Sequence, residues 1–454
     1  MTAADRHYEK MTKTPIAKLV LLLGIPTTIS MLITNLYNLV DTYFVGTLGE
    51  SQQGATGILF TLQCIIQAVA FMLGQGSGAF VSKCLANKDS KEASKYVSSA
   101  FFIGGFVGIL LMAGGLIFLE PFMKLLGSTN TILPYAKDYG LWVLISCPFM
   151  ICSLVLNNNL RFEGLSFVSM IGLGTGAIIN IFGDYYFVKV LGMGVYGAGL
   201  ATASSQIISF FILLIFFLTK AQSKISFKYI SLKIKTYTEV CLCGLPSLIR
   251  QGLTSISSGI LNNLTKVYGD VAIAAMSIVN RYSSFVLCVG LGIGQGFQPV
   301  ASFNYQAKEY KRVKKSMTFT LKFGIIAVGA LALIGLLMPE QVLRLFQKNS
   351  EVIKIGKYAM IAASIGTMFL PISVTTNMLY QSIRKSTIAS FLALLRSGLT
   401  LIPMLFLLSA LFNLKGIQSA QPVADILTSL ISLPFMIYFL FKTPNSIEEE
   451  KTVA

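Results

Sequence analysis

The sequence predicts an all-α, polytopic membrane protein with twelve transmembrane helices in two parallel six-helix repeats. Of its 454 residues, 54% are hydrophobic and 12% are charged, and the mean hydropathy is +0.71. A soluble protein usually has about twice that charged fraction. Apolar stretches long enough to cross a bilayer recur along the chain, and short motifs return at a fixed spacing.

Twelve apolar stretches predict the twelve helices, because a helix needs about 20 residues to cross the hydrocarbon layer. The first stretch runs from Ile16 to Val40, which is too long for the apolar region of a signal peptide, so we expect it to be retained. The stretches begin near residues 16, 54, 96, 134, 166, 195, 238, 271, 316, 355, 387 and 417.

Basic residues predict the orientation. The net charge is +17, and most Lys and Arg residues lie in loops on one side of the predicted spans, which the positive-inside rule places in the cytoplasm together with both termini. Charge spread over short loops is unlike the basic face of a DNA-binding domain, so no nucleic-acid partner is expected. The predicted domains are a cytoplasmic N-terminal tail (1–15), an N-lobe (16–218), a cytoplasmic linker (219–237), a C-lobe (238–441) and a cytoplasmic C-terminal tail (442–454).

A constant offset of 220 residues reveals the repeat. LLGIP at residues 22–26 matches LCGLP at 242–246, and GQG at 74–76 matches GQG at 294–296. Each repeat holds an even number of spans, so both repeats enter the membrane from the same side. Such duplication is typical of secondary transporters, in which substrate passes between the halves. A duplicated channel or scaffold is the alternative.

The composition argues against an enzyme. The one histidine, His7, lies in the polar N-terminal tail, so the core can hold no His-based metal site or Ser-His-Asp relay. Seven cysteines, mostly in apolar stretches, do not suggest a disulfide framework. The glycine-rich runs at 74–78 and 172–176 lack the features of a phosphate loop, and we interpret them as close-packing positions. We expect no ATP site and no cofactor.

Five segments resemble the multidrug and toxic compound extrusion (MATE) transporters, particularly their DinF-type and MepA-like bacterial branch. They are GIP at 24–26, LVDTYFVGTLG at 39–49, LRFEG at 160–164, NIFGD at 180–184 and, most specifically, GQGFQPVASFNYQAK at 294–308. The resemblance extends over nearly the whole chain. It implies a V-shaped pair of six-helix lobes in the bacterial inner membrane that exports organic compounds, including antibiotics, against an inward H⁺ or Na⁺ gradient.

Ionisable residues within spans are functional candidates, because inserting a charge into hydrocarbon costs about 2.5–3.5 kcal/mol. Asp41 and Asp184 reach similar heights toward the outer face, Asn180 precedes Asp184 by one turn, and Thr202 lies near the start of the sixth span. Two buried carboxylates cannot both stay ionised, so these oxygens suit a shared proton or a cation such as Na⁺. In DinF-type relatives, the resemblance implies, these positions form the coupling-ion site, sometimes with a tyrosine at Tyr37.

The alternative without an ion site is that Asp41 caps a helix end in interfacial water and that Thr202 is a hydroxyl side chain used for helix packing. No other metal site is expected. The spans of the C-terminal half contain almost no acid, so the C-lobe cation site of NorM-type relatives is expected to be missing.

The spans of the C-terminal half instead contain three arginines at mid-span depth, namely Arg250, Arg281 and Arg396. Together with Gln251 they are candidates for a substrate cavity. They either bind an anionic or zwitterionic substrate group or pair with carbonyls and acids to hold the lobes, and the second interpretation is slightly favoured.

Two further features lie at helix ends and kinks. Arg161 and Glu163, at the cytoplasmic end of the fourth span, are interpreted as a structural ion pair or a gate latch. Pro26 is a hinge candidate, because proline frees a helix carbonyl and permits bending, although a static kink fits the sequence equally well.

Together these observations predict a monomeric antiporter embedded in membrane lipid. A proton or Na⁺ loads on Asp41 and Asp184 in the outward-facing state and displaces the exported compound, which is expected to be small and amphipathic or cationic. One alternative is a flippase for a lipid-linked oligosaccharide or a metabolite. An alternative from another class is a channel or membrane receptor.

Overall fold

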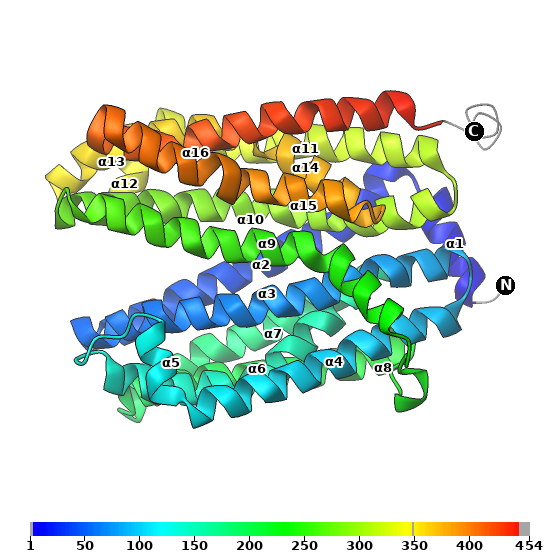
Figure 1. Cartoon of the computed structure of the whole chain (residues 1–454), viewed down its shortest axis with the longest axis horizontal. Helices are drawn as coiled ribbons and strands as arrows, with labels where there is room; N and C mark the ends of the chain where they lie inside the picture. Colours follow the sequence, from blue (N-terminus) through cyan, green and yellow to red (C-terminus); the bar gives the residue numbers. More distant parts are fainter. Residues whose placement is uncertain (1–2, 347–348, 445–454) are drawn as a thin grey trace. The chain divides into compact units, whose positions relative to one another are not determined.

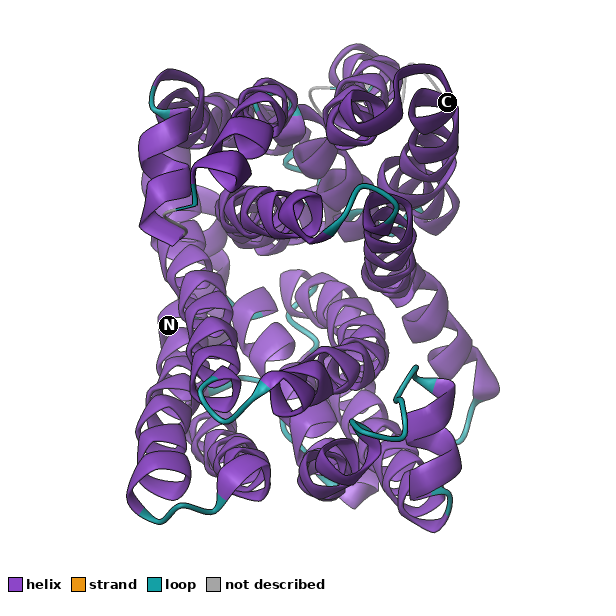
Figure 2. Cartoon of the chain, turned by 90° about the vertical axis from the view of Figure 1, so that its left-hand side faces the viewer, coloured by secondary structure: helices purple, strands orange, loops and turns teal. Residues whose placement is uncertain are grey.

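The computed structural model describes residues 3–346 and 349–444, which are almost entirely helical and contain no strand (Figure 2). Their internal contacts divide the chain into two compact units. Unit 1 comprises the described residues up to Tyr8 together with Ile29–Gln251, and unit 2 comprises Glu9–Thr28 together with the described residues from Gly252 onward. Each unit is therefore discontinuous in sequence.

Unit 1 holds the helices of the first repeat, from α3 to α8, and parts of three others (Figure 1). Its elements are the start of α1 (Ala3–Lys13), the second part of α2 (Ile16–Gly46), α3 (Glu50–Ala86), α4 (Ser90–Ile117), α5 (Leu119–Leu125), α6 (Leu133–Phe162), α7 (Ser166–Asp184), the π-helix η1 (Tyr185–Val190), α8 (Gly194–Lys220), the 3-10 turn η2 (Phe227–Tyr229) and the first part of α9 (Ile234–Lys266).

Unit 2 holds the second repeat. It contains the remainder of α1, α2 and α9, together with α10 (Asp270–Gln306), α11 (Tyr310–Leu337), α12 (Pro339–Phe346), α13 (Ser350–Thr367), α14 (Leu370–Ser382), α15 (Ser386–Leu394), the π-helix η3 (Leu395–Thr400) and α16 (Leu401–Lys442). The α16 helix is kinked at Asn413, where the backbone leaves helical geometry, and α13 meets α14 at a bend of 44°.

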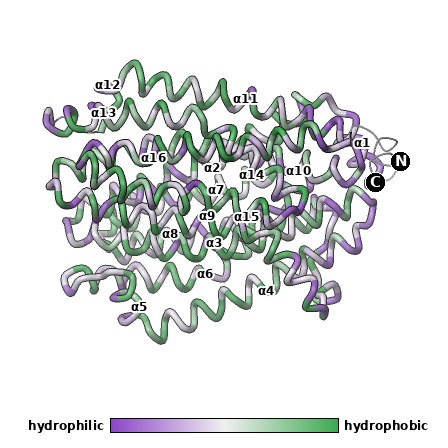
Figure 3. The backbone as a smooth tube through the Cα atoms, turned by 45° about the horizontal axis from the view of Figure 1, so that its top comes forward, coloured by the Kyte–Doolittle hydropathy of each residue, from purple (hydrophilic) through white to green (hydrophobic). Residues whose placement is uncertain are grey.

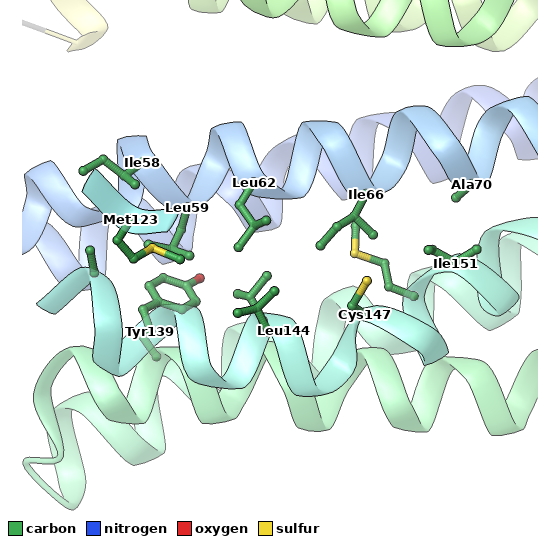
Figure 4. Packing of buried hydrophobic residues seen from close by; sticks show 14 of the residues in the cluster. Ile58, Leu59, Leu62, Ile66, Ala70, Met123, Tyr139, Leu144, Cys147 and Ile151 are labelled. Carbon is green, nitrogen blue, oxygen red and sulfur yellow. The ribbon is translucent and has the colours of Figure 1, made fainter. Parts of the chain in front are cut away.

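The core of unit 1 forms where α3 packs on α6 (Figure 4). Leu59, Leu62 and Ile66 of α3 meet Leu144 and Ile151 of α6, and all five side chains are buried. In a bilayer the lipid is as apolar as these residues, so helix association depends on close packing and dispersion contacts. Large aliphatic residues on both faces supply those contacts.

The 220-residue offset persists in local geometry. Lys88 and Lys308 both have a φ of 60° at the end of a long helix. In unit 1, Nδ2 of Asn157 donates to the carbonyl of Ser169 at 3.1 Å, and in unit 2 the equivalent Asn377 donates to the carbonyl of Ala389 at 2.7 Å. The two repeats therefore fold with the same turns and the same side-chain contacts to the backbone.

The repeated glycine motifs pack against each other. In unit 1, a Cβ atom on Gly76 of α3 would lie 2.0 Å from the carbonyl oxygen of Val240 in α9, and one on Gly244 would lie 1.8 Å from the carbonyl oxygen of Met72. In unit 2, a Cβ atom on Gly296 of α10 would lie 2.2 Å from Cα of Gly24 in α2. Such distances exclude any side chain, which confirms the interpretation of the glycine-rich run at 74–78 as close packing.

Each unit is thus completed by the first part of a helix from the other repeat. The first part of α2 packs on α10, and the first part of α9 packs on α3. The division between units falls after Thr28 in α2 and after Gln251 in α9, a few residues beyond Pro26 and Pro246. These boundaries differ from the predicted lobes (16–218 and 238–441), which group whole helices.

Each of the twelve predicted starts lies in a helix or at its beginning. In the described part of the chain, nine helices are long and apolar enough to cross a membrane, or ten if the bent α13 and α14 form one span. One of the nine is the run Ser386–Lys442, which contains the kink at Asn413, and α9 is not among them. Figure 3 shows apolar residues along helices such as α4 and α11. The number twelve stays a prediction.

The predicted tails and linker differ in character. Most of the predicted tail at 1–15 is the helix α1. The predicted linker at 219–237 is largely the segment between α8 and α9, which is hydrogen-bonded to α4. Of the predicted tail at 442–454, residues 445–454 lie outside the described residues.

Candidate functional site

Four of the five predicted coupling-ion residues lie in pairs on two helices of unit 1. Tyr37 and Asp41 are one turn apart on α2, and Asn180 and Asp184 are one turn apart on α7. Residues at i and i+4 share a helix face, so each helix presents its pair in one direction. The fifth residue, Thr202, lies on α8, which packs on α7. The structure brings all five into one buried cluster.

Tyr139 of α6 links three of these side chains. Its hydroxyl donates to Oδ2 of Asp41 at 2.8 Å and lies 3.0 Å from Oγ1 of Thr202. Oγ1 of Thr202 accepts from Nδ2 of Asn180 at 3.2 Å. Because Tyr139 gives its one proton to Asp41, the hydroxyl of Thr202 donates to Tyr139. A chain of hydrogen bonds thus runs from Asn180 through Thr202 and Tyr139 to the carboxylate of Asp41, with every donor directed toward that carboxylate.

Asp184 and Tyr37 complete the cluster. Asp184 is close enough to Asp41 for their charges to interact directly, and the hydroxyl of Tyr37 is close to both carboxylates. Tyr37 also lies near Gln206, which is one turn after Thr202 on α8. α2, α7 and α8 therefore each present two polar side chains, and α6 presents Tyr139.

The cluster contains buried oxygen atoms that no protein group satisfies. Among the described residues, Oδ1 of Asp41, Oδ1 of Asn180 and both carboxylate oxygens of Asp184 are buried without a hydrogen-bond donor. Asp184 is fully buried, Asp41 is 7% exposed, and no described ion pair involves either one. A buried, uncompensated carboxylate is costly. The unsatisfied oxygen atoms are therefore the part of the cluster at which a proton or a cation could bind.

The oxygen atoms define what the site can hold. Two carboxylates, an amide and hydroxyls are hard ligands that suit an alkali cation, and the same carboxylates can share a proton. No group of three or more His, Cys, Asp and Glu side chains gathers in the described ranges. With both carboxylates ionised, the site carries a charge of −2. One proton or one monovalent cation changes it to −1.

Sequence reasoning missed Tyr139 and Gln206. Gln206 was accessible to the argument used for Asn180 and Asp184, because it is four residues after Thr202 and so shares its face. Tyr139 gave a weaker signal, since tyrosine is common near the ends of membrane spans. A π-helix, η1, begins directly after Asp184, and such helices are frequent at functional sites.

The four substrate-cavity candidates are divided between the units. Arg250 and Gln251 belong to unit 1, and Nε2 of Gln251 lies 3.5 Å from Oε1 of Gln67 on α3. Arg281 is exposed on α10 of unit 2, and Arg396 lies in the π-helix η3 of the same unit. The structure does not gather them into one site within either unit.

Arg396 has a buried acidic partner that the sequence analysis overlooked. Its Nε donates to Oδ1 of Asp425 on α16 at 2.9 Å, and Nε2 of Gln421 donates to the same oxygen at 3.0 Å. The expectation that the spans of the C-terminal half carry almost no acid is therefore corrected at Asp425. For Arg396 the contacts agree with the interpretation as a structural ion pair.

Glu163 joins α6 to the segment that follows α8. Its carboxylate accepts from the backbone N–H of Gln222 at 2.6 Å and from the backbone N–H and the hydroxyl of Ser223. Burial raises the pKa of Glu163 to about 7, against the opposing effect of these donors. Nη2 of Arg161 donates to Oδ1 of Asn158 at 2.7 Å. These contacts differ from the predicted pairing of Arg161 with Glu163.

The hinge candidate, Pro26, lies inside the continuous helix α2. The hydroxyls of Thr27 and Thr28 donate to the carbonyls of Leu23 at 2.7 Å and Gly24 at 2.9 Å in the same turn. Proline and hydroxyl donors weaken the helical hydrogen-bond ladder at one point. Bending at Pro26 stays a prediction.

Comparison with curated proteins gives relatives over the full length. The chain is 25% identical over 460 residues to the multidrug export protein MepA of Staphylococcus aureus, which covers 99% of each chain. It is 24% identical over 439 residues to the protein of that name from Staphylococcus saprophyticus, which covers 96% of each.

Solved structures share the fold. One is described as the outward-facing conformation of a multidrug resistance MATE family transporter of the MOP superfamily, with a TM-score of 0.91, 20% identity and coverage of 98% of this chain and 99% of that one. Another is a MOP superfamily transporter from Pyrococcus furiosus, with a TM-score of 0.87, 20% identity and coverage of 96% and 98%.

The MatE family model matches the chain twice, over residues 26–186 and 246–407. The two matches begin 220 residues apart, which is the offset of the sequence motifs and of the backbone turns. Together they cover well over half of the sequence. The chain therefore belongs to the MatE family.

Proposed function

We propose that this protein is a secondary transporter that exports small organic compounds, drugs among them, in exchange for H⁺ or Na⁺ bound at Asp41 and Asp184. The observation that carries the proposal is the buried pair of carboxylates with three oxygen atoms that lack a protein donor. Membership of the MatE family and full-length similarity to multidrug export proteins support the transport class. The protein is a multi-pass protein of a bacterial membrane.

The chemistry of the cluster couples the two flows. When both carboxylates are ionised, the cluster carries two negative charges that no ion pair among the described residues compensates, so closing it away from water is unfavourable. A proton or Na⁺ on the pair removes half of that charge. Tyr139 continues to donate to Asp41, and the amide oxygen of Asn180 is available to a cation beside Asp184. The loaded cluster can be enclosed, which lets the protein return without substrate.

The available driving force is adequate. One elementary charge moving through about 150 mV releases about 3.5 kcal/mol. That energy supports a gradient of roughly 300-fold in a neutral substrate. No nucleotide is needed in this scheme.

The test is efflux from proteoliposomes under an imposed ΔpH or ΔNa⁺, followed with a fluorescent organic cation. Asp41→Asn and Asp184→Asn should each abolish gradient-driven transport, because the amide cannot take up a proton and carries no charge for a cation. Asp138→Asn is the matched control, since Asp138 is exposed on α6 next to Tyr139. If both cluster variants transport as well as the control, the proposal fails.

The same vesicles separate the two ions and the alternatives. Flux that follows ΔpH in Na⁺-free buffer assigns the proton, and flux that follows ΔNa⁺ at equal pH assigns sodium. A lipid flippase would move labelled lipid but not the organic cation, and a channel would conduct without a gradient-dependent exchange. We further propose a monomer with both termini in the cytoplasm, supported by the basic loops.

A further inference from the structure

The segment between α8 and α9, residues 221–233 and called here the connecting segment, is fixed to α4 by three serines. Oγ of Ser94 accepts from the N–H of Lys224 at 2.8 Å, Oγ of Ser98 accepts from the N–H of Ser226 at 3.2 Å, and Oγ of Ser99 accepts from the N–H of Ser231 at 2.9 Å. All three serines are buried. The backbone of the connecting segment is therefore held along one helix instead of hanging free as a linker.

The connecting segment lies where α4 becomes apolar. The ring of Phe227 stacks on Phe102 with centroids 4.2 Å apart and an interplanar angle of 26°. Phe102 is near the start of the long apolar run of α4, so Phe227 is at the level where the hydrocarbon of a bilayer begins. The side chain of Phe227 is nevertheless 77% exposed. Leu232 is 98% exposed, and Ile234, the first residue of α9, is 80% exposed.

Exposed lysines surround these apolar side chains. Between Lys220 and Thr238 the sequence contains no Asp or Glu. The five lysines in and beside the connecting segment are all exposed, namely Lys220, Lys224, Lys228, Lys233 and Lys235. Three acids close to the segment in sequence or through its contacts are engaged. Glu163 is buried against Ser223, Glu239 accepts from the hydroxyl of Tyr96 at 2.7 Å, and Glu92, two residues before Ser94, is paired with Lys95 at 3.0 Å.

We propose that the connecting segment is a binding site for anionic phospholipids of the surrounding bilayer. The exposed apolar side chains enter the boundary between headgroups and acyl chains, and the lysines contact the phosphates above it. The position of Phe227 at the start of the apolar run favours lipid over a soluble acidic partner, and the absence of Asp and Glu between Lys220 and Thr238 favours an anionic headgroup over a neutral one. The proposal does not depend on what the protein transports.

Lipid bound here also acts on the packing of unit 1. The connecting segment is bonded to α4 through the serines and to Glu163 at the end of α6. A ligand that binds only the ordered segment stabilises the contacts that order it. Anionic lipid should therefore raise the thermal stability of the full chain as well as bind to it.

Quenching of a tryptophan tests the contact directly. The chain has one tryptophan, Trp142, so Trp142→Phe combined with Phe227→Trp gives a single reporter in the connecting segment. The protein is reconstituted in phosphatidylcholine nanodiscs that contain brominated phosphatidylglycerol or brominated phosphatidylcholine. We expect both lipids to quench, with an apparent preference for phosphatidylglycerol of about fivefold or more, which falls in 0.5 M NaCl.

Charge removal supplies the matched comparison. Lys→Gln at positions 224, 228, 233 and 235 should remove the preference while leaving quenching by the neutral lipid. The control removes four exposed lysines elsewhere, at positions 189, 266, 354 and 415, and should keep the preference. In the parent protein with Phe227 intact, phosphatidylglycerol should raise the melting temperature, and the first set of substitutions alone should cancel that rise.

Three results would overturn the proposal. Equal quenching by the two lipids would show that the site does not select anionic headgroups. Absence of quenching by either lipid would show that position 227 does not face the bilayer. Loss of preference in both lysine sets would assign the effect to overall charge instead of the connecting segment.

Discussion

Breaking the Arg396–Asp425 pair of unit 2 should destabilise the protein far more than replacing both residues. Asp425 is 1% exposed, and the side chain of Arg396 is 16% exposed. The equivalent positions of the first repeat, 220 residues earlier, are Gly176 and Ser205. There a Cβ atom on Gly176 would lie 3.2 Å from the carbonyl oxygen of Ser205. At these positions of the first repeat, α7 and α8 therefore pack through small, uncharged residues.

The cost of each change follows from burial. In Arg396→Met, the carboxylate of Asp425 keeps only the donor of Gln421 among the contacts described above, and removing one partner of a buried pair costs about 3–5 kcal/mol. We expect a loss of about 4 kcal/mol.

Removing the acid instead should cost slightly less. In Asp425→Leu the guanidinium of Arg396 loses its partner but is partly exposed, so about 3 kcal/mol is expected. The double variant Arg396→Met/Asp425→Leu leaves no charge and similar volume, and should lie within about 1 kcal/mol of the parent.

Thermal unfolding of the four proteins in one detergent at pH 7 measures these differences, and roughly 4 °C separates the single variants from the parent, because unfolding entropy is about 2.1 cal/mol/K per residue and the chain has 454 residues. The reasoning is refuted if the double variant is as unstable as the sum of the two single variants.

Three other predictions concern unit 1. The pKa of Glu163 is about 7 in the folded protein, against an ordinary value of 4.5, so the folded state favours the protonated carboxyl. The free energy of unfolding should therefore fall by about 3 kcal/mol as the pH rises from about 4.5 to 7. Melting curves of Glu163→Gln should lack that fall. Gly244→Ala places a methyl group against a backbone carbonyl of α3 and should lower the stability in thermal unfolding by at least about 3 kcal/mol. The control Gly259→Ala, on the same helix with open space at its Cβ, should not destabilise the protein. Tyr139→Phe removes the donor that stabilises the ionised carboxylate of Asp41, so the coupling ion should bind about tenfold more tightly. The ion should then leave more slowly in proteoliposome exchange. The control Tyr135→Phe, one turn earlier, should behave as the parent.

The sequence was sufficient for the helices and for much of the cluster. Hydrophobic length places every predicted span on a helix, because it depends only on local composition. Asp41 and Asp184 stand out because charge within an apolar run is costly and rare. Their neighbours Asn180 and Tyr37 follow from helix periodicity and from the resemblance.

The rest depends on which helix faces meet. The bond from Tyr139 to Asp41 joins residues 98 positions apart, and the bond from Arg396 to Asp425 joins two different helices. Neither contact has a periodic signature in the sequence. Closeness along the chain predicts a pair between Glu163 and Arg161, whereas the carboxylate of Glu163 accepts from Ser223, 60 residues away.

The exchange of α2 and α9 between the units constrains how the chain is made. Gly24 emerges from the ribosome early, but its packing partner on α10, Gly296, is synthesised about 270 residues later, which at 5–20 residues per second takes roughly 15–50 s. During that time the first part of α2 lies in the bilayer without its packing partner α10. A fragment cut at the connecting segment would lack that partner permanently, so the two repeats are expected to assemble only when both are present.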